Sequence, residues 1–464
     1  QSKLFLLLFL ACVGSLGVSR GNDEQSKEPA CEDAGPDDIY LDLSDMELQR
    51  ISKPMVSSSK ITCLNLAENQ IGSISSDAFD GLPELRYLNF AGNPVPPNEF
   101  AQTKLPTLKT LVLDGPIPDR NNNYRGQYDQ DFGNIFSFSM PELEKLSLQD
   151  YEENDEHIVL HWLQGFKVPN LTHLYLSGNT RLGGELSNIL SNMNNLTHLY
   201  LDRTQVDYLD RTSLSNLRHL SMNGNNIRSI GAGYYSSYDN SGVPRGMYNL
   251  EYLSLAYNEI ANVSSNFFAT SPNLRFLNLA VNAIDNFPLQ TSMDLVNLRN
   301  LTLDNNKLSR VPEMCGLKAL RYLSLNENNI VSVNVQSFCN MQNLSEIYLR
   351  RNGLSNIDDE TFGHLPALVV LDLSYNNIVS LPENWIYPKN FIAELHLDSN
   401  KFIDIDSMSL KGVGGLQCLS FGHNPLKMVT ILSLMDLPNS TRFDTRPMDR
   451  CNNWYRATLT TLNP

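Results

Sequence analysis

The sequence LEYLSLAYNEI, residues 250–260, decides the fold because near copies of it follow one another along the chain. The next seven copies begin at Leu274, Leu298, Leu320, Leu344, Leu368, Ile392 and Leu416. Each has the pattern L-x-x-L-x-L-x-x-N-x-L, and the steps between its asparagines from Asn258 to Asn424 are 24, 24, 22, 24, 24, 24 and 24 residues. Such a repeat predicts a solenoid, in which each coil buries its apolar side chains against its neighbours.

Upstream copies of the pattern raise the predicted number of coils to about sixteen. They begin at Ile61, Leu85, Leu171, Leu196 and Leu217, with degenerate copies at Ile39, Leu108 and Leu143. In the L-x-L core, successive side chains of a short strand point to opposite faces, so the leucines point inward. The asparagine amide both donates and accepts, and it can satisfy backbone groups that the following turn buries.

These features predict an α/β solenoid shaped as a horseshoe, with a parallel sheet on the concave face and disulfide-tied caps. Aromatic residues outside the strands are expected to fill the wider convex side. They are Phe79, Phe267, Phe338, Phe362 and Trp385.

The two ends of the chain differ from the repeats. Lys3 precedes an apolar run, Leu4–Val13, and small residues follow at Gly17–Ser19, so residues 1–19 are predicted to be a signal peptide of a secreted, extracellular chain. We assign residues 20–38 to an acidic N-terminal segment and cap, 39–425 to the repeat domain, and 426–464 to a C-terminal cap and a tail of undefined end. The best later membrane-span candidate, Leu426–Leu437, is too short and carries charges.

Composition and motifs narrow the class of function. The chain has 35 Lys plus Arg and 51 Asp plus Glu, a net charge of -16, which disfavours nucleic acid and anionic membranes as partners. No nucleophile elbow, phosphate loop or thiolate metal cluster occurs in the sequence. We therefore predict a protein that is not an enzyme and that needs no cofactor or metal.

The 24-residue repeat period, the LPxxxF-like repeat ends such as Leu381-Pro382 and the predicted signal peptide resemble the extracellular, typical-type leucine-rich repeat proteins of animals. That family includes Toll-type receptor ectodomains, small matrix proteoglycans and the secreted leucine-rich immune proteins of insects. The resemblance covers about residues 31–450. It implies a binding scaffold, most like the secreted immune proteins, although the coiled coil that many of these carry after the repeats is absent from this chain.

Six cysteines remain after the predicted signal peptide. Cys315 and Cys339 each lie five residues before the first leucine of the next repeat, so they are expected to stack on adjacent coils about 5 Å apart, within disulfide range. Near each end of the array one cysteine occupies the same strand position, and another lies in the flanking segment. The three predicted disulfides are Cys31–Cys63, Cys315–Cys339 and Cys418–Cys451.

Six N-x-S/T sequons in an exported chain predict glycosylation. They are at Asn170, Asn195, Asn262, Asn300, Asn343 and Asn439. Asn300 precedes Leu301 and is expected to point from the concave sheet, so a glycan there would shift any concave ligand toward the ends of the arc.

Aligning the repeats gives the outward column of the sheet. It contains Tyr87, Thr110, Lys145, His173, His198, His219, Tyr252, Phe276, Asn300, Tyr322, Glu346, Val370 and Glu394. Its three consecutive histidines are expected to form a ladder with rungs near 5 Å that titrates near neutral pH, flanked by Tyr175, Tyr200, Asp202 and Arg203. The alternative is three exposed strand residues without a role. Metal binding is disfavoured because the column offers no matching oxygen or thiolate.

The C-terminal half of the concave face is expected to carry outward acidic residues and to suit a basic partner surface. The acidic residues of the face are Asp202, Asp304, Glu327, Glu346, Asp372, Glu394 and Asp398. Only Arg350 and Arg351 interrupt the acidic stretch.

Two insertions break the period, one between Pro116 and Tyr151 and one between Asn225 and Asn258. Insertions in solenoids project as loops and often carry function. The second insertion sets three tyrosines among Ser, Gly and Asn, a composition typical of antibody paratopes; a loop without a binding role is the alternative. These are Tyr234, Tyr235 and Tyr238.

His157 and His161 are four residues apart and would share a helical face, but no H-E-x-x-H motif is present. Amphipathic packing of Ile158, Leu160 and Trp162 explains the pattern better than a zinc site.

Together these features predict a secreted solenoid that binds an extracellular protein or glycan through its concave face and the tyrosine-rich loop, in extracellular recognition or innate immunity. Two alternatives stay open: the ectodomain of a Toll-like membrane receptor, and a structural matrix or adhesion protein. The ligand and the oligomeric state are not defined by the sequence.

Overall fold

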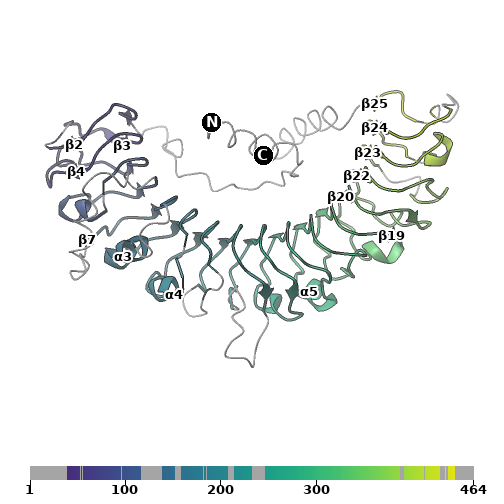
Figure 1. Cartoon of the computed structure of the whole chain (residues 1–464), viewed down its shortest axis with the longest axis horizontal. Coiled ribbons are helices and arrows are strands. Elements are labelled where there is room, and N and C mark those ends of the chain that lie inside the picture. Colours follow the sequence, from purple (N-terminus) through teal and green to yellow (C-terminus); the bar gives the residue numbers. More distant parts are fainter. Residues whose placement is uncertain are drawn as a thin grey trace, which may run out of the picture.

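The main sheet of the protein follows the repeats one strand at a time. The computed structural model describes residues 39–444 except 53, 55, 96, 116–137, 152–157, 181, 184, 207–208, 210–213, 232–245, 387–390, 412, 429–433 and 435–436. In this part of the chain, a 17-stranded sheet lines the concave side of a horseshoe (Figure 1). Every pairing in it is parallel, and the equivalent leucines lie side by side, as Leu253 does with Leu220 and Leu277.

Each of the sixteen predicted coils contributes one strand. The strands of the main sheet are β1 (Ile39–Asp42), β3 (Ile61–Asn65), β5 (Tyr87–Asn89), β6 (Thr110–Val112), β8 (Lys145–Ser147), β10 (His173–Tyr175), β11 (His198–Tyr200), β12 (His219–Ser221), β14 (Tyr252–Ser254), β16 (Phe276–Asn278), β17 (Asn300–Thr302), β18 (Tyr322–Ser324), β20 (Glu346–Tyr348), β22 (Val370–Asp372), β23 (Glu394–His396), β24 (Cys418–Ser420) and β25 (Arg442–Asp444). The last of these, β25, lies in the segment predicted as a C-terminal cap and pairs with β24.

Short helices and strand pairs form the outer side (Figure 1). The helices are α3 (Ile158–Gly165), α4 (Glu185–Leu190) and α5 (Leu289–Asp294), and the 3-10 turns are η2 (Pro97–Gln102), η3 (Phe268–Thr270), η4 (Val335–Phe338) and η5 (Asp406–Met408). The strand pairs are β2 (Arg50–Ile51) with β4 (Ser73–Ile74), β7 (Phe138–Ser139) with β9 (Phe166–Lys167), β13 (Ser229–Ile230) with β15 (Asn262–Val263), and β19 (Ser332–Val333) with β21 (Asn356–Ile357). In α3, Leu160 and Trp162 are buried, as the amphipathic interpretation predicts. His157 lies outside the described residues.

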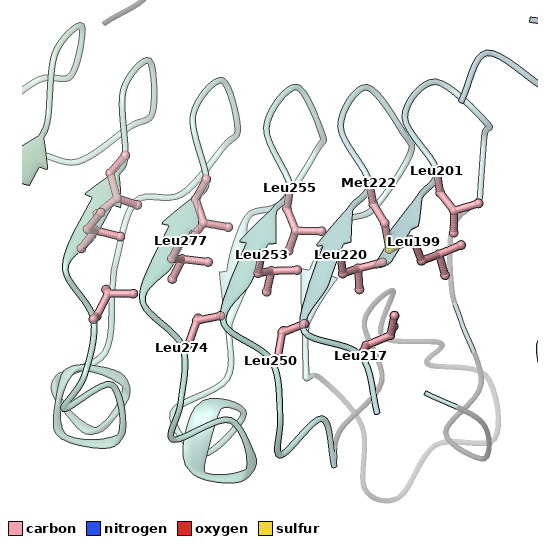
Figure 2. Packing of buried hydrophobic residues seen from close by; sticks show 14 of the residues in the cluster. Leu199, Leu201, Leu217, Leu220, Met222, Leu250, Leu253, Leu255, Leu274 and Leu277 are labelled. Carbon is pink, nitrogen blue, oxygen red and sulfur yellow. The ribbon is translucent and has the colours of Figure 1, made fainter. Parts of the chain in front are cut away.

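The core is a set of parallel apolar columns between the two sides. Leu220, Leu253 and Leu277 form one column, and Met222 and Leu255 belong to the next (Figure 2). The predicted filling of the convex side is confirmed, because Phe79, Phe267, Phe338, Phe362 and Trp385 are all at most 3% exposed. Burial of apolar surface against neighbouring coils is thus continuous along the arc.

The repeat asparagine links adjacent coils as the sequence predicts. The Asn282 Nδ2 donates to the carbonyl oxygens of Leu279, in its own coil, at 3.1 Å and of Leu255, one coil earlier, at 3.0 Å. Its Oδ1 accepts from the Ile260 N–H at 2.9 Å. The Asn282 side chain therefore pairs buried backbone groups of its own coil and of the preceding coil.

A left-handed backbone residue precedes this asparagine in most coils. The φ angles are 56° at Tyr257, 54° at Val281 and 50° at Asn305. Arg203 and Arg351 occupy the same position, at 56° and 53°. This conformation turns the chain away from the sheet, and it places these side chains on the rim where the strands end.

The central predicted disulfide is confirmed. Cys315 and Cys339 are bonded, with their Cα atoms 4.9 Å apart. Cys63 and Cys418 are also disulfide-bonded. Their predicted partners, Cys31 and Cys451, lie outside the described residues, so those two pairings stay predictions.

Candidate functional site

Five aromatic rings stack on the concave face in one line, which we call the ring column: His173, His198, His219, Tyr252 and Phe276. They come from consecutive strands, β10, β11, β12, β14 and β16, whose register is unshifted. The centroid distances along the column are 4.0, 5.6, 3.9 and 4.3 Å, and neighbouring planes differ by at most 21°. The predicted histidine ladder is present, and two further rings extend it.

A second row lies two residues further along the same strands. The rings of Tyr175 and Tyr200 stack at 4.6 Å, and Tyr200 contacts the His219 ring at 4.7 Å. Tyr175 and Tyr200 are each 6% exposed and His219 is 4% exposed, whereas the other four rings of the column are half-buried. The site is therefore a packed, pre-ordered aromatic surface.

Threonine hydroxyls contact the Nδ1 atoms of the first two histidines of the ring column. The hydroxyl of Thr172 donates to the Glu144 carbonyl at 3.0 Å, and that of Thr197 donates to the Thr172 carbonyl at 3.1 Å. Each hydroxyl oxygen also lies 2.8 Å from the Nδ1 of the next residue, His173 or His198. Whether each Nδ1 donates or accepts in this contact depends on the tautomer of the ring. In a neutral ring Nε2 then has the opposite role.

The expectation that the histidines titrate near neutral pH is wrong for two of them. The pKa of His173 is lowered to about 3, first by burial and then by the neighbouring His198 and Lys145. The pKa of His219 is also lowered to about 3, first by burial and then by His198 and His173. Packing between rings removes the water that would stabilise an imidazolium, and a second charge 4 to 6 Å away would repel it. At physiological pH these two imidazoles are uncharged.

Asp202 has a role within the solenoid rather than as a free surface charge. Its carboxylate accepts from the Ser221 hydroxyl and from the Asn223 N–H of the next coil, each at 2.7 Å. Burial raises the pKa of this carboxyl group above its ordinary value. In the following coil Asn223 makes the equivalent bonds to the next coil. Its Oδ1 accepts from the Ser254 hydroxyl at 2.7 Å and from the Ala256 N–H at 2.8 Å.

The same arrangement recurs further along. Asp304 accepts from the Ser324 hydroxyl at 2.5 Å and from the Asn326 N–H at 2.8 Å, and burial raises its pKa to about 6. Asp398 accepts from the Ser420 hydroxyl and from the Gly422 N–H in the same way.

The expectation of an exposed acidic surface in the C-terminal half is wrong at three positions. Asp372, Glu394 and Asp398 are at most 4% exposed. His396 lies among them, with its Nε2 3.7 Å from the Glu394 carboxylate. Burial disfavours a charged imidazole there, but Glu394 and the neighbouring carboxylates outweigh burial and raise the pKa of His396. The imidazole is thus attracted to the carboxylates around it, although neither of its ring nitrogens has a hydrogen-bond partner in the described structure.

The predicted arginines lie on the rim. The guanidinium groups of Arg350 and Arg351 are 4.4 and 5.3 Å from the centroid of the Tyr375 ring, and Arg351 pairs with Glu327 at 3.1 Å. Arg203, also on the rim, lies 3.6 Å from the Asp150 carboxylate. Sequence reasoning missed Tyr375, although its place directly before the repeat asparagine is the signal that would have placed it on this rim.

Beyond the ring column, Asn300 separates Phe276 from Tyr322 in the sheet register. Tyr322 is 8% exposed and contacts the Tyr348 ring at 5.3 Å. Asn300 itself is half-buried on the concave face, where the sequence predicts it. Tyr348 was missed because it occupies the second outward position of its strand rather than the first.

The other predicted sequons are exposed in the described chain. Asn170, Asn195 and Asn343 lie at the rim where strands begin, and their Nδ2 atoms donate to backbone carbonyls of the preceding coil at 2.8 to 2.9 Å. Asn262 and Asn439 are exposed too. Their modification stays a prediction. The loop tyrosines Tyr234, Tyr235 and Tyr238 lie outside the described residues.

The described residues lack two kinds of feature. They contain no group of three or more His, Cys, Asp or Glu side chains placed to hold a metal ion. None of their helices has the length and apolar character needed to cross a bilayer.

The parallel sheet, the asparagine ladder and the repeat period define the chain as a leucine-rich repeat protein. A family profile described as Leucine rich repeat matches residues 40–95, 248–308, 297–354 and 342–388. A second profile of the same description matches residues 213–233. The resemblance deduced from the sequence is thus confirmed.

Within that class, the chain has relatives among Toll-like receptors. It is 23% identical to human Toll-like receptor 8 over 312 residues, which are 59% of this chain and 29% of that receptor. The chain therefore spans less than a third of the length of this relative.

Solved structures support the fold. A leucine-rich repeat protein of Leptospira interrogans has a TM-score of 0.64 and 23% identity, covering 87% of this chain and 95% of its own. A chain of the Toll–Spatzle complex of Drosophila has a TM-score of 0.54 and 16% identity, covering 82% of this chain and 53% of its own.

Proposed function

We propose that this protein is a secreted recognition protein that binds an extracellular protein ligand through the ring column, in innate immunity. The observation that carries the proposal is the column itself: five stacked rings on the concave face, with uncharged imidazoles at His173 and His219. The Toll-like relatives support a role in protein recognition. No catalytic task is assigned to the site.

The chemistry of the column indicates what a partner must provide. Neutral imidazoles and tyrosine rings suit a surface that presents hydrogen-bonding groups among apolar groups. Stacking has already fixed these side chains, so binding would lose little additional rotamer freedom. The net charge of -16 further supports a protein partner over a nucleic acid. A glycan, which also offers hydroxyl donors, is the other ligand class that the sequence predicts.

A second candidate function is the ectodomain of a Toll-like membrane receptor. It is favoured by the match to human Toll-like receptor 8, of which the chain spans 29%. Sequencing the complete transcript distinguishes the two. An apolar run of about twenty residues beyond Pro464 would support the receptor, and a stop codon without such a run would support the secreted protein.

The test of the main proposal compares two double variants. Tyr252→Ser with Phe276→Ser changes the half-buried end of the ring column, and Leu289→Ser with Met293→Ser changes two exposed apolar side chains of α5 on the convex side. Each protein is immobilised and exposed to extracellular fluid of the source organism, and captured proteins are quantified by mass spectrometry. We expect a partner retained by the wild type and the α5 variant to fall at least about tenfold with the column variant, which corresponds to about 1.4 kcal/mol. Equal capture by all three would contradict the proposal.

A further inference from the structure

A groove on the outer side of the solenoid is distinct from the concave site. It has a volume of about 660 Å³ and lies between α3 with β9 and the neighbouring helix α4. This volume is within the range of about 300 to 1,000 Å³ typical of small-molecule sites. Its lining residues are Ser139, Leu163, Gln164, Phe166, Lys167, Val168, Pro169, Asn188, Ile189, Asn192 and Met193.

The inner wall of the groove is apolar. Leu163, Phe166, Val168, Ile189 and Met193 line it, and each is at most 7% exposed. These side chains are held by the core, because all five belong to its continuous apolar cluster. The wall is therefore pre-formed, and an apolar group entering the groove would leave water without requiring the coils to move.

The mouth of the groove is polar and carries one cation. Gln164, Asn188 and Asn192 are exposed amides at its edge, and Lys167 is the lysine among the lining residues. Among the residues that the structure describes, Lys167 has no carboxylate within ion-pair distance, whereas Lys109 pairs with Glu144 at 2.7 Å. The Lys167 ammonium is therefore available to a negative group of a ligand, in a chain whose net charge is -16.

We infer that this groove binds a small, monomeric amphiphile that has an apolar tail and an anionic head group. The tail packs on the wall formed by Leu163, Phe166 and Met193, and the head group lies at the mouth, beside the Lys167 ammonium and the amide groups. An apolar wall alone would accept any hydrophobic molecule. Lys167 is what makes the site prefer an anion over the neutral molecule of the same length.

The test uses decanoate as the probe, decanol as its uncharged counterpart and isothermal titration calorimetry below the micellar concentration. We expect saturable binding of decanoate by the full chain, about fivefold tighter than that of decanol, the upper range for a partly exposed ion pair. Lys167→Gln should remove this preference while leaving decanol binding unchanged. Lys401→Gln, at an exposed lysine of the C-terminal half, is the matched control and should behave as the wild type.

A second variant tests whether the probes bind in the groove, independently of the charge of Lys167. Asn188→Trp places a large ring at the mouth from an exposed position, and it should abolish the binding of both probes without changing the thermal unfolding curve. The inference is overturned by equal affinity for decanoate and decanol, or by wild-type binding in Asn188→Trp. Binding to phosphatidylglycerol vesicles without binding to decanoate would also overturn it, because the ligand would then be a membrane surface.

Discussion

At the residue scale, His219 shows how packing within the ring column determines the pKa of an imidazole. Its ring stacks on Tyr252 at 3.9 Å, and its Nε2 has no hydrogen-bond partner in the described structure. The pKa of His219 is lowered to about 3, below the ordinary value of 6.5. Between pH 3 and pH 6.5, His219 is protonated in the unfolded chain but not in the folded chain. The stability that neutral His219 contributes is therefore present above pH 6.5 and is lost progressively as the pH falls toward 3.

His219→Phe should therefore stabilise the protein, and more strongly at acidic pH. Phenylalanine keeps the stack and removes the unsatisfied nitrogen, so the free energy of unfolding at pH 7.5 should rise by about 1 kcal/mol. At pH 5 the advantage should grow by about 2 kcal/mol, since the variant has no imidazole to protonate there. Urea unfolding followed by circular dichroism at both pH values measures this. His364→Phe, at a largely exposed histidine, serves as the control, and an advantage of His219→Phe that does not change with pH would contradict the assignment.

At the element scale, each coil needs a left-handed residue between its strand and its asparagine. Glycine fills this place at Gly92, Gly178 and Gly224, where φ is 71°, 78° and 65°. Val281 fills it at 54°, although a branched Cβ is crowded in this region. The Asn282 side chain holds the turn, because it bonds to the Leu279 carbonyl of its own coil and to Leu255 and Ile260 of the preceding coil. Coil geometry thus overrides residue preference at this position.

Val281→Asn should therefore stabilise the protein. Asn305 occupies the same position one coil later, at 50°, and asparagine tolerates the left-handed region better than valine does. We expect the free energy of unfolding to rise by about 1 kcal/mol. The matched control is Val331→Asn, at a residue that is 56% exposed and is not among the left-handed positions. Chemical denaturation compares the two, and the same effect in both variants would mean that backbone strain at Val281 is not the cause.

At the scale of the whole molecule, the fold was predictable because two separate features of the repeat, its leucines and its asparagine, both predict it. Leucine spacing gives the strand register, and the asparagine gives the turn, so both the sheet and the ladder at Asn282 follow from the sequence. Even the ring column follows, since equal repeat position places His173, His198 and His219 in line.

The electrostatics of the site were not predictable in the same way. The pattern places Asp202, Asp304 and Asp398 outward, but it does not reveal that hydroxyl and amide groups of the next coil bind their carboxylates. It also does not give the burial of His173 and His219, which depends on how closely the rings pack in three dimensions. The repeat pattern predicts where a side chain lies on the solenoid. Its charge state depends instead on contacts with residues of the neighbouring coils, about two dozen positions away in the sequence.

The central claim is that a partner protein contacts the ring column, and site-specific photocrosslinking tests it most directly. The photoreactive residue p-benzoylphenylalanine replaces Phe276, in the column, or Phe391, a 70% exposed residue just ahead of β23. Irradiation in extracellular fluid of the source organism should give a covalent adduct with a protein at Phe276 that excess unmodified chain suppresses, and no such adduct at Phe391. An adduct at Phe391 alone, or adducts of equal yield at both positions, would contradict the account.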